Sequence, residues 1–185
     1  MSTERNVAVL VGSLRKESFS RKVAKSLVEL AAPALTLEIV EIGEMPFYNQ
    51  DLETATPPAW AAFRDRIRPV DAVQFVTPEY NRSVPAVLKN AIDVGSRPFG
   101  KSVFDKKPAG VVSVSQGAIG GFGANQHLRQ SLVFLNMPPL QAPEAYIGGA
   151  DRLFDEGGRL ANSSTREFLS KYLQAFAAWI ERTRT

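Results

Sequence analysis

Short apolar runs alternate along the chain with segments in which apolar residues recur every three or four positions. The apolar runs predict strands, since a run of this kind bounded by turn residues is typical of a strand buried on both faces. Five strands are expected, over residues 7–11, 35–40, 72–76, 108–113 and 140–146. The second alternates apolar and polar residues and should be more exposed, and Pro143 makes the fifth an edge strand.

The segments between the strands have the apolar spacing of helices. Helices are expected over residues 18–32, 57–68, 84–96, 124–137 and 163–182, with an irregular loop over 43–56. Strand and helix thus alternate five times, which predicts an α/β fold with a doubly wound parallel sheet, right-handed crossovers and helices on both faces. No repeat, low-complexity tract or linker divides the chain, so we expect a single domain over residues 1–185.

Composition agrees with a globular protein and excludes several functions. The 185 residues are 44% apolar and 22% charged, enough for a core that needs no disulfide or metal. A net charge of +3 is too weak to indicate nucleic-acid binding, and it argues against an acidic electron-shuttle surface. No stretch approaches the roughly 20 apolar residues of a membrane span, and the N-terminus has no apolar signal-peptide region, so we expect a soluble cytoplasmic protein.

Reactive side chains are scarce. The chain has no cysteine, which excludes a thiolate nucleophile, a disulfide and a cysteine-ligated metal. Its one histidine, His127, lies on a predicted helix without a visible partner, a position more typical of a surface residue than of a general base. Any redox chemistry must therefore reside on a bound cofactor.

Three polar loops mark the place where a ligand should bind. In an open α/β sheet, ligands bind outside the carboxyl ends of the strands, near the switch point of strand order. The loops after the first, third and fourth predicted strands, residues 12–20, 77–83 and 115–123, are rich in Ser, Gly, Asn and Arg. We therefore expect the site at these loops.

The first loop has the chemistry of a phosphate site. It contains one glycine, Gly12, and so matches neither a Walker A loop nor a dinucleotide-binding loop. Its hydroxyls, Arg15 and the free N–H groups of a helix N-terminus suit a phosphate monoester. Cations surround this helix start, which is unfavourable at the positive end of a helix dipole unless an anion lies between them. The alternative is an ordinary Ser-capped helix with a solvated basic first turn.

The other two loops suit a planar ring. In the second loop two prolines fix the backbone, Tyr80 offers a flat apolar face, and Asn81 could hydrogen-bond a ring edge. The alternative is a stiff turn with Tyr80 packed down. In the third loop, glycines allow the backbone to approach a ligand closely, and the alternative is a flexible connector.

Together these loops resemble those of a known family. Residues 12–18, residues 78–93, the Ser-x-Gly-x-x-Gly-Gly segment at 115–121 and Leu128-Arg129-Gln130 are similar to motifs of the flavodoxin-like NAD(P)H-dependent FMN reductases, in the chromate or quinone reductase branch. The resemblance covers nearly the whole chain. It implies a flavodoxin-like sheet of five parallel strands in the order 2-1-3-4-5.

The resemblance assigns residues to the cofactor FMN and none to a catalytic side chain. Ser13, Arg15, Ser18 and Ser20 would bind the phosphate, Pro78, Glu79, Tyr80 and Asn81 would lie along the isoalloxazine, and Ser115 and Gly117 would approach its other side. One departure is that the family usually has Asn at the position of Ser20, and serine reaches less far. The family also implies homodimers that pair into tetramers.

An FMN-dependent NAD(P)H oxidoreductase is therefore expected. It would pass electrons from NADPH or NADH through FMN to quinones or other small acceptors, such as free flavin, azo compounds or chromate. Arg82, Arg97 and Lys101 are candidates for contacting the extra phosphate of NADPH. Two alternatives stay open. One is a flavodoxin-type electron carrier without its own nicotinamide oxidation, against which the net charge and the open third loop count, and the other is a non-redox binder of a phosphorylated metabolite.

Overall fold

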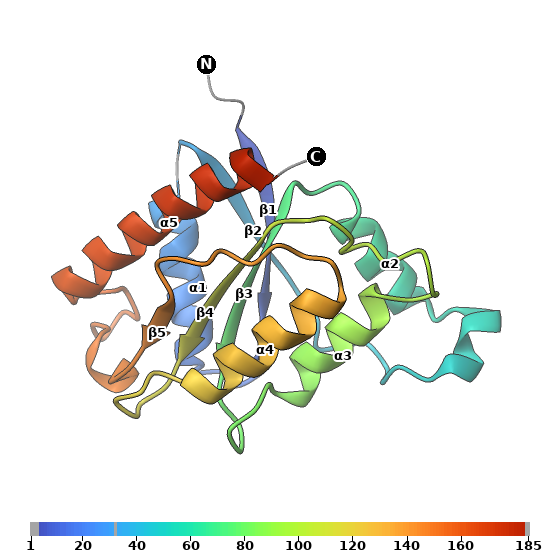
Figure 1. Ribbon diagram of the computed structural model, residues 1–185. Coiled ribbons are helices and arrows are strands. Elements are labelled where there is room, and N and C mark those ends of the chain that lie inside the picture. Colours follow the sequence, from blue (N-terminus) through green and yellow to red (C-terminus); the bar gives the residue numbers. More distant parts are fainter. Residues whose placement is uncertain (1–3, 32, 184–185) are drawn as a thin grey trace.

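The structure, a computed structural model, describes residues 4–31 and 33–183. Its centre is a sheet of five parallel strands in the order β2-β1-β3-β4-β5 (Figure 1). The strands are β1 Arg5–Val11, β2 Leu35–Val40, β3 Ala72–Pro78, β4 Ala109–Val114 and β5 Ala145–Ile147. The predicted fold class and strand order are confirmed.

Helices cover both faces of this sheet (Figure 1). They are α1 Phe19–Leu30, α2 Pro58–Ile67, α3 Ala86–Gly95, α4 Phe122–Phe134 and α5 Ser163–Thr183, with short 3₁₀ helices η1 Gln50–Ala55 and η2 Ala150–Arg152. α1 and α5 pack on one face, and α2, α3 and α4 pack on the other. No helix in the described part of the chain is long and apolar enough to cross a membrane.

The strand β1 shows why the predicted strands are continuously apolar. Val7, Val9 and Val11 belong to the core under α1 and α5, whereas Ala8 and Leu10 belong to the core under the other three helices. Successive side chains of a strand point to opposite faces, so a strand covered on both sides needs apolar residues at every position. With both faces closed, a ligand has access only at the ends and edges of the sheet.

Proline and glycine geometry moves several predicted helix boundaries. α3 begins at Ala86 and not at Val84, because a residue that precedes a proline disfavours the helical conformation. α4 begins at Phe122, inside the predicted third loop, after Gly121 has taken a left-handed φ of 78°. The predicted end of the first helix, Ala32, lies outside the described residues, and α1 ends at Leu30.

The C-terminal half departs from prediction in two further places. α4 ends at Phe134 and not at residue 137, and Asn136 then takes a left-handed φ of 56°. β5 covers only 145–147, although the Leu140 N–H already donates to the Ala109 carbonyl oxygen at 2.8 Å. Pro143 has no N–H to donate and interrupts the pairing, and the predicted edge position of this strand is confirmed. The loop expected at 43–56 contains the 3₁₀ helix η1.

Candidate functional site

The loops after β1, β3 and β4 meet at the carboxyl edge of the sheet and line one cavity of about 270 Å³. We call it the three-loop cavity. Of the residues predicted from the resemblance, it is lined by Ser13, Arg15, Ser18, Ser20, Pro78, Glu79, Tyr80 and Ser115. Asn81 and Gly117 do not line it. The polar loops that the sequence singled out are therefore brought together around one hollow.

Three lining residues were not predicted: Phe19, Val114 and Gln116. Phe19 and Gln116 each lie directly beside a predicted residue, so sequence neighbourhood was the available indication. Val114 is the last residue of β4, and nothing in its apolar run distinguishes it from core residues. A search for polar residues alone therefore misses apolar site residues at the ends of strands.

Ser18 begins α1 as its N-cap. Its Oγ accepts a hydrogen bond from the Arg21 N–H at 3.1 Å, as the Ser-capped alternative expects. The hydroxyl hydrogen of Ser18 can still donate to a ligand. Ser13, Ser18 and Ser20 are buried, and the first turn of α1 has no acid. Buried hydroxyls at the positive end of a helix dipole suit an anion.

Arg15 contacts two residues of its own loop. Its Nη2 donates to the Glu17 carbonyl oxygen at 2.6 Å, and its guanidinium carbon lies 5.4 Å from the centroid of the Phe19 ring. Neither partner is a carboxylate, and Arg15 forms no ion pair within the residues that the structure covers. Its charge is therefore available to an anion in the three-loop cavity.

The second loop is a tight reversal after β3. The Tyr80 N–H donates to the Ser83 carbonyl oxygen at 3.1 Å, and the Ser83 N–H donates back to Tyr80 at 3.0 Å. Between them Asn81 and Arg82 have φ values of 51° and 63°, as in a type I′ turn. Asparagine tolerates this conformation, whereas it costs arginine about 1 kcal/mol or more. The turn places Asn81 at an exposed tip and leaves Tyr80 in the cavity wall, 52% exposed and not packed down.

Glu79 connects the second loop to the third. Its Oε2 accepts a hydrogen bond from the Ala124 N–H in the first turn of α4 at 3.0 Å, and its Oε1 lies 3.2 Å from Arg82 Nη1. The side chain is only 12% exposed. Gly123 makes room for it, since a Cβ there would come within 2.9 Å of Glu79 Oε2 and 2.8 Å of the Arg82 carbonyl oxygen. The carboxylate of Glu79 thus ties the second loop, which lines the cavity, to the start of α4.

The third loop has defined hydrogen bonds, unlike a flexible connector. Ser115 Oγ accepts from the Gly117 N–H at 3.1 Å, and the Gly120 N–H donates to the Gly117 carbonyl oxygen at 3.2 Å. Gly120 has a φ of 61°, and a Cβ there would come within 2.6 Å of the Tyr146 backbone. At Gly117, in contrast, a Cβ would meet only Ser115 Oγ, at an ordinary 3.5 Å. The fold itself does not require glycine at 117. A ligand lying against this loop would require glycine there.

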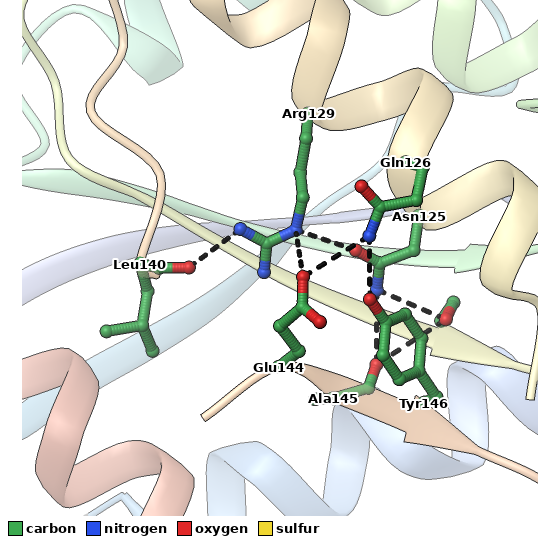
Figure 2. Close-up of polar contacts among 8 residues, drawn as sticks. Asn125, Gln126, Arg129, Leu140, Glu144, Ala145 and Tyr146 are labelled. Carbon is green, nitrogen blue, oxygen red and sulfur yellow. Dashed lines mark hydrogen bonds and ion pairs between the residues drawn. The ribbon is translucent and has the colours of Figure 1, made fainter. Parts of the chain in front are cut away.

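A buried polar network fixes α4 against β5 next to the third loop (Figure 2). Asn125 Nδ2 donates to Ser113 Oγ and to the Ala145 carbonyl oxygen, both at 3.2 Å. Asn125 Oδ1 accepts from Arg129 Nε at 2.9 Å, and Arg129 Nη1 donates to the Leu140 carbonyl oxygen at 2.8 Å. The network therefore joins α4 to β4, β5 and the segment that leads into β5, where ladder hydrogen bonds are few.

Gln126, Glu144 and Tyr146 extend this network outward (Figure 2). Gln126 Nε2 donates to the Tyr146 hydroxyl at 2.7 Å and to Glu144 Oε1 at 3.2 Å. Hydrogen bonds from Tyr146 and Gln126 lower the pKa of Glu144, while burial and the Glu144 carboxylate raise the pKa of Tyr146. The Tyr146 ring packs on Phe122 with 5.4 Å between centroids. β5 and the start of α4 are therefore fixed on both sides of the third loop.

His127 lies outside the three-loop cavity. Its Nδ1 lies 3.1 Å from Ser83 Oγ, and the side chain is exposed on α4. The residue thus connects α4 to the second loop. No cluster of His, Asp or Glu suited to a metal ion occurs among the described residues.

The three-loop cavity fits a phosphorylated planar ligand such as FMN. The buried hydroxyls and Arg15 lie together at the helix start, where a phosphate would be neutralised. Pro78 and Tyr80 offer flat surface in the cavity wall, and Gly117, just outside the lining, leaves its side unobstructed. The residues present therefore supply both a phosphate end and a ring end.

Known proteins are similar to this chain in sequence and in fold. The family profile of NADPH-dependent FMN reductases matches residues 5–152. A quinone reductase of Pseudomonas putida is 62% identical over 185 residues, 100% of this chain and 99% of that protein. A 2-hydroxy-1,4-benzoquinone reductase of a Burkholderia species is 40% identical over 178 residues, 96% of this chain and 97% of that protein. The solved structure of FerB, a flavoenzyme NAD(P)H:(acceptor) oxidoreductase from Paracoccus denitrificans, has a TM-score of 0.92 and 39% identity, covering 98% of this chain and 100% of that chain.

Proposed function

The chain belongs to the NADPH-dependent FMN reductase family and is an FMN-dependent NAD(P)H oxidoreductase, and from this premise we propose that quinones are the acceptors it reduces. The names of its relatives support this choice, since two of them reduce quinones. The exposed ring of Tyr80 in the cavity wall supports it as well, because a flat aromatic acceptor can rest against it. Family membership sets aside the electron carrier and the non-redox metabolite binder.

We assign the two ends of FMN to the residues that line the three-loop cavity. Ser13, Ser18 and Ser20 donate hydrogen bonds to the phosphate, and Arg15 neutralises it. Pro78, Glu79 and Tyr80 lie along the ring, as does Asn81 through the backbone of its turn, and Ser115 and Gly117 approach the other side. This assignment follows the resemblance residue by residue, with Ser20 as the shorter donor.

FMN held by these residues would supply the redox chemistry, which is hydride transfer from the nicotinamide and electron transfer to the acceptor. The protein holds the ring and leaves room beside it. The carboxylate of Glu79 accepts a hydrogen bond from the Ala124 N–H, and its role is to hold the loops. Donor and acceptor use the same open side and exclude each other, which predicts ping-pong kinetics.

The observation that carries the proposal is the single cavity with a phosphate end and an open ring end. Its test is steady-state turnover of the FMN-loaded protein with NADPH or NADH against a panel of quinones, free flavin, an azo dye and chromate. We expect parallel initial-rate lines and the highest kcat/KM for quinones. Intersecting lines would contradict the shared site, and a higher kcat/KM for any other acceptor class would contradict quinones as the substrate.

We propose in addition that each chain is one flavodoxin-like domain over residues 1–185. Four chains form a homotetramer, which works in the cytoplasm. Large apolar side chains left exposed near the second and third loops, Tyr80, Ile119 and Phe122, support association. The nicotinamide donor, a metabolite of the cell interior, supports the location. Light scattering at micromolar concentration should report four chains, and a monomer would contradict the assembly.

A further inference from the structure

A larger cavity, of about 490 Å³, lies beside the three-loop cavity, and Ser18 lines both. It runs along one side of α1 and is bounded on the other side by residues 156–159. We call it the basic cavity. Its charged lining residues are Lys16, Glu17, Arg21, Lys22, Lys25, Glu29, Glu156 and Arg159. Five of these residues are cations and three are acids.

Three of these cations already have carboxylate partners. Arg21 is held by Glu41, outside the cavity, through contacts of 2.6 and 2.7 Å. Lys22 Nζ lies 3.2 Å from Glu17, and Arg159 Nε lies 3.2 Å from Asp155. The remaining two cations, Lys16 and Lys25, form no ion pair within residues 4–31 and 33–183, and neither do the two other lining acids, Glu29 and Glu156. The two lysines are the side chains available to an incoming anion.

The wall opposite α1 is built by specific contacts. The Phe154 ring stacks on Phe19 with 6.4 Å between centroids, and Lys22 Nζ lies 5.7 Å from the Phe19 ring and 6.0 Å from the Phe154 ring. Gly158, with a φ of 76°, turns the chain toward Lys22. The basic cavity is therefore bounded by two packed segments and does not depend on one helix end.

The position of the basic cavity matters because a nicotinamide dinucleotide is much longer than its reacting ring. When the nicotinamide lies in the three-loop cavity, the adenosine end must leave it along one of its rims. Arg97 and Lys101 do not lie on that side, since they follow α3 and precede β4 at the opposite edge of the sheet. Arg82 is exposed and paired with Glu79. A cavity beside β5, lined by 146–148, 164–165 and 168, contains no charged side chain.

We propose that the basic cavity binds the 2′-phosphate of NADPH, with Lys16 and Lys25 compensating its charge. The proposal rests on the proposed function, because the nicotinamide must occupy the three-loop cavity. A phosphate monoester carries a charge of about −1.5 to −2 at pH 7, whereas NADH has a neutral hydroxyl at the same position. The enzyme therefore prefers NADPH, and the preference falls as salt rises.

Two small nucleotides test the site directly. Calorimetric titration of the FMN-loaded protein with 2′,5′-ADP and with 5′-AMP compares ligands that differ by the 2′-phosphate alone. We expect 2′,5′-ADP to bind more tightly and to inhibit NADPH oxidation competitively with NADPH. Equal affinities would overturn the proposal. Inhibition that is not competitive would also overturn it, since the phosphate would then bind apart from the dinucleotide.

Charge-removing variants locate the preference. Because each contact is partly exposed, Lys16→Gln and Lys25→Gln should each lower the affinity for 2′,5′-ADP about fivefold, and the double variant should remove most of the preference over 5′-AMP. The ratio of KM values for NADPH and NADH should change in parallel. Lys101→Gln is the matched control and should change neither quantity.

A preference that survives the double variant, or one that is lost in Arg82→Gln instead, would place the phosphate elsewhere and refute the proposal. Failure of the proposed function has a different outcome. If the protein holds no FMN, or does not reduce quinones, the proposed function is wrong whatever the nucleotide affinities are. A loaded, active enzyme whose nucleotide preference ignores Lys16 and Lys25 would contradict the basic cavity alone.

Discussion

Replacing Glu79 with alanine should loosen the site more than it harms the rest of the fold. The substitution removes a carboxylate that accepts a hydrogen bond from the Ala124 N–H at 3.0 Å while 12% exposed. A hydrogen bond to a charged group contributes roughly 1.5–3 kcal/mol, and the position at a helix N-terminus adds about 0.3–1 kcal/mol. The pair with Arg82, whose side chain is 73% exposed, adds little. We expect a loss of about 2 kcal/mol in the free energy of unfolding.

The same loss should appear in the affinity for FMN. Glu79 holds the second loop against the start of α4, and FMN needs the second loop in place. If the bridged arrangement loses about 2 kcal/mol, the apparent Kd for FMN rises by up to about thirtyfold. Glu79→Gln keeps an oxygen that accepts from Ala124 and loses only the charge, so its losses should be about half as large in free energy.

Urea unfolding of the apoprotein, followed by circular dichroism, measures the first quantity. Titration of the apoprotein with FMN, followed by quenching of flavin fluorescence, measures the second. An alanine variant with the wild-type urea midpoint and the wild-type Kd would refute the bridge. Equal losses in Glu79→Gln and Glu79→Ala would show that the charge and not the hydrogen bond holds the loops.

Four further substitutions probe other parts of the site. Arg15→Ala should raise the Kd for FMN about ten- to a hundredfold in the same titration. The FMN-loaded variant should turn over at a nearly normal rate, because the phosphate is remote from the reacting ring. An unchanged Kd would remove Arg15 from the site. Gly117→Ala should leave the urea midpoint of the apoprotein unchanged, since its Cβ meets only Ser115 Oγ at 3.5 Å, and should weaken FMN binding. Gly123→Ala should destabilise the apoprotein itself, since its Cβ would come within 2.8 Å of the Arg82 carbonyl oxygen. Wild-type FMN affinity in Gly117→Ala would mean that no ligand approaches that loop. Hydrogen bonds lower the folded-state pKa of Glu144 below its ordinary 4.5, so the stability that Glu144 contributes is present above pH 4.5 and lost as the pH falls through the lowered pKa. Glu144→Gln should therefore flatten the fall in urea midpoint below pH 4.5. An unaltered pH profile would contradict the network's role.

Short-range patterns were sufficient to predict a parallel sheet and to point to the cavity that the three loops line, whereas the strand order came from the family resemblance. The run from Val7 to Val11 predicts a strand covered on both faces, and the alternation of such runs with helical segments predicts a parallel order. Parallel strands put all their following loops at one edge, so polarity in three loops was enough to locate the cavity.

Contacts between distant residues could not be predicted in this way. Glu79 and Ala124 are far apart in sequence, and neither periodicity nor composition indicates that one caps the helix of the other. The left-handed φ of Gly121 likewise decides where α4 begins, although a glycine in a Gly-rich loop gives no sign of which residue will adopt it. The conformation of Arg82 opposes its intrinsic preference and depends on the closed turn from Tyr80 to Ser83.

The closure of both sheet faces by helices separates two kinds of mutational tolerance. Residues under the helices determine whether the chain folds, and apart from Val114 none of them lines the three-loop cavity. The tips of the loops at the carboxyl edge, such as Asn81 and Gln116, are exposed and bear little of the packing. Acceptor preference can therefore drift among descendants of this chain at little cost in folding, provided that the drift spares Glu79 and Gly123, where the loops are joined.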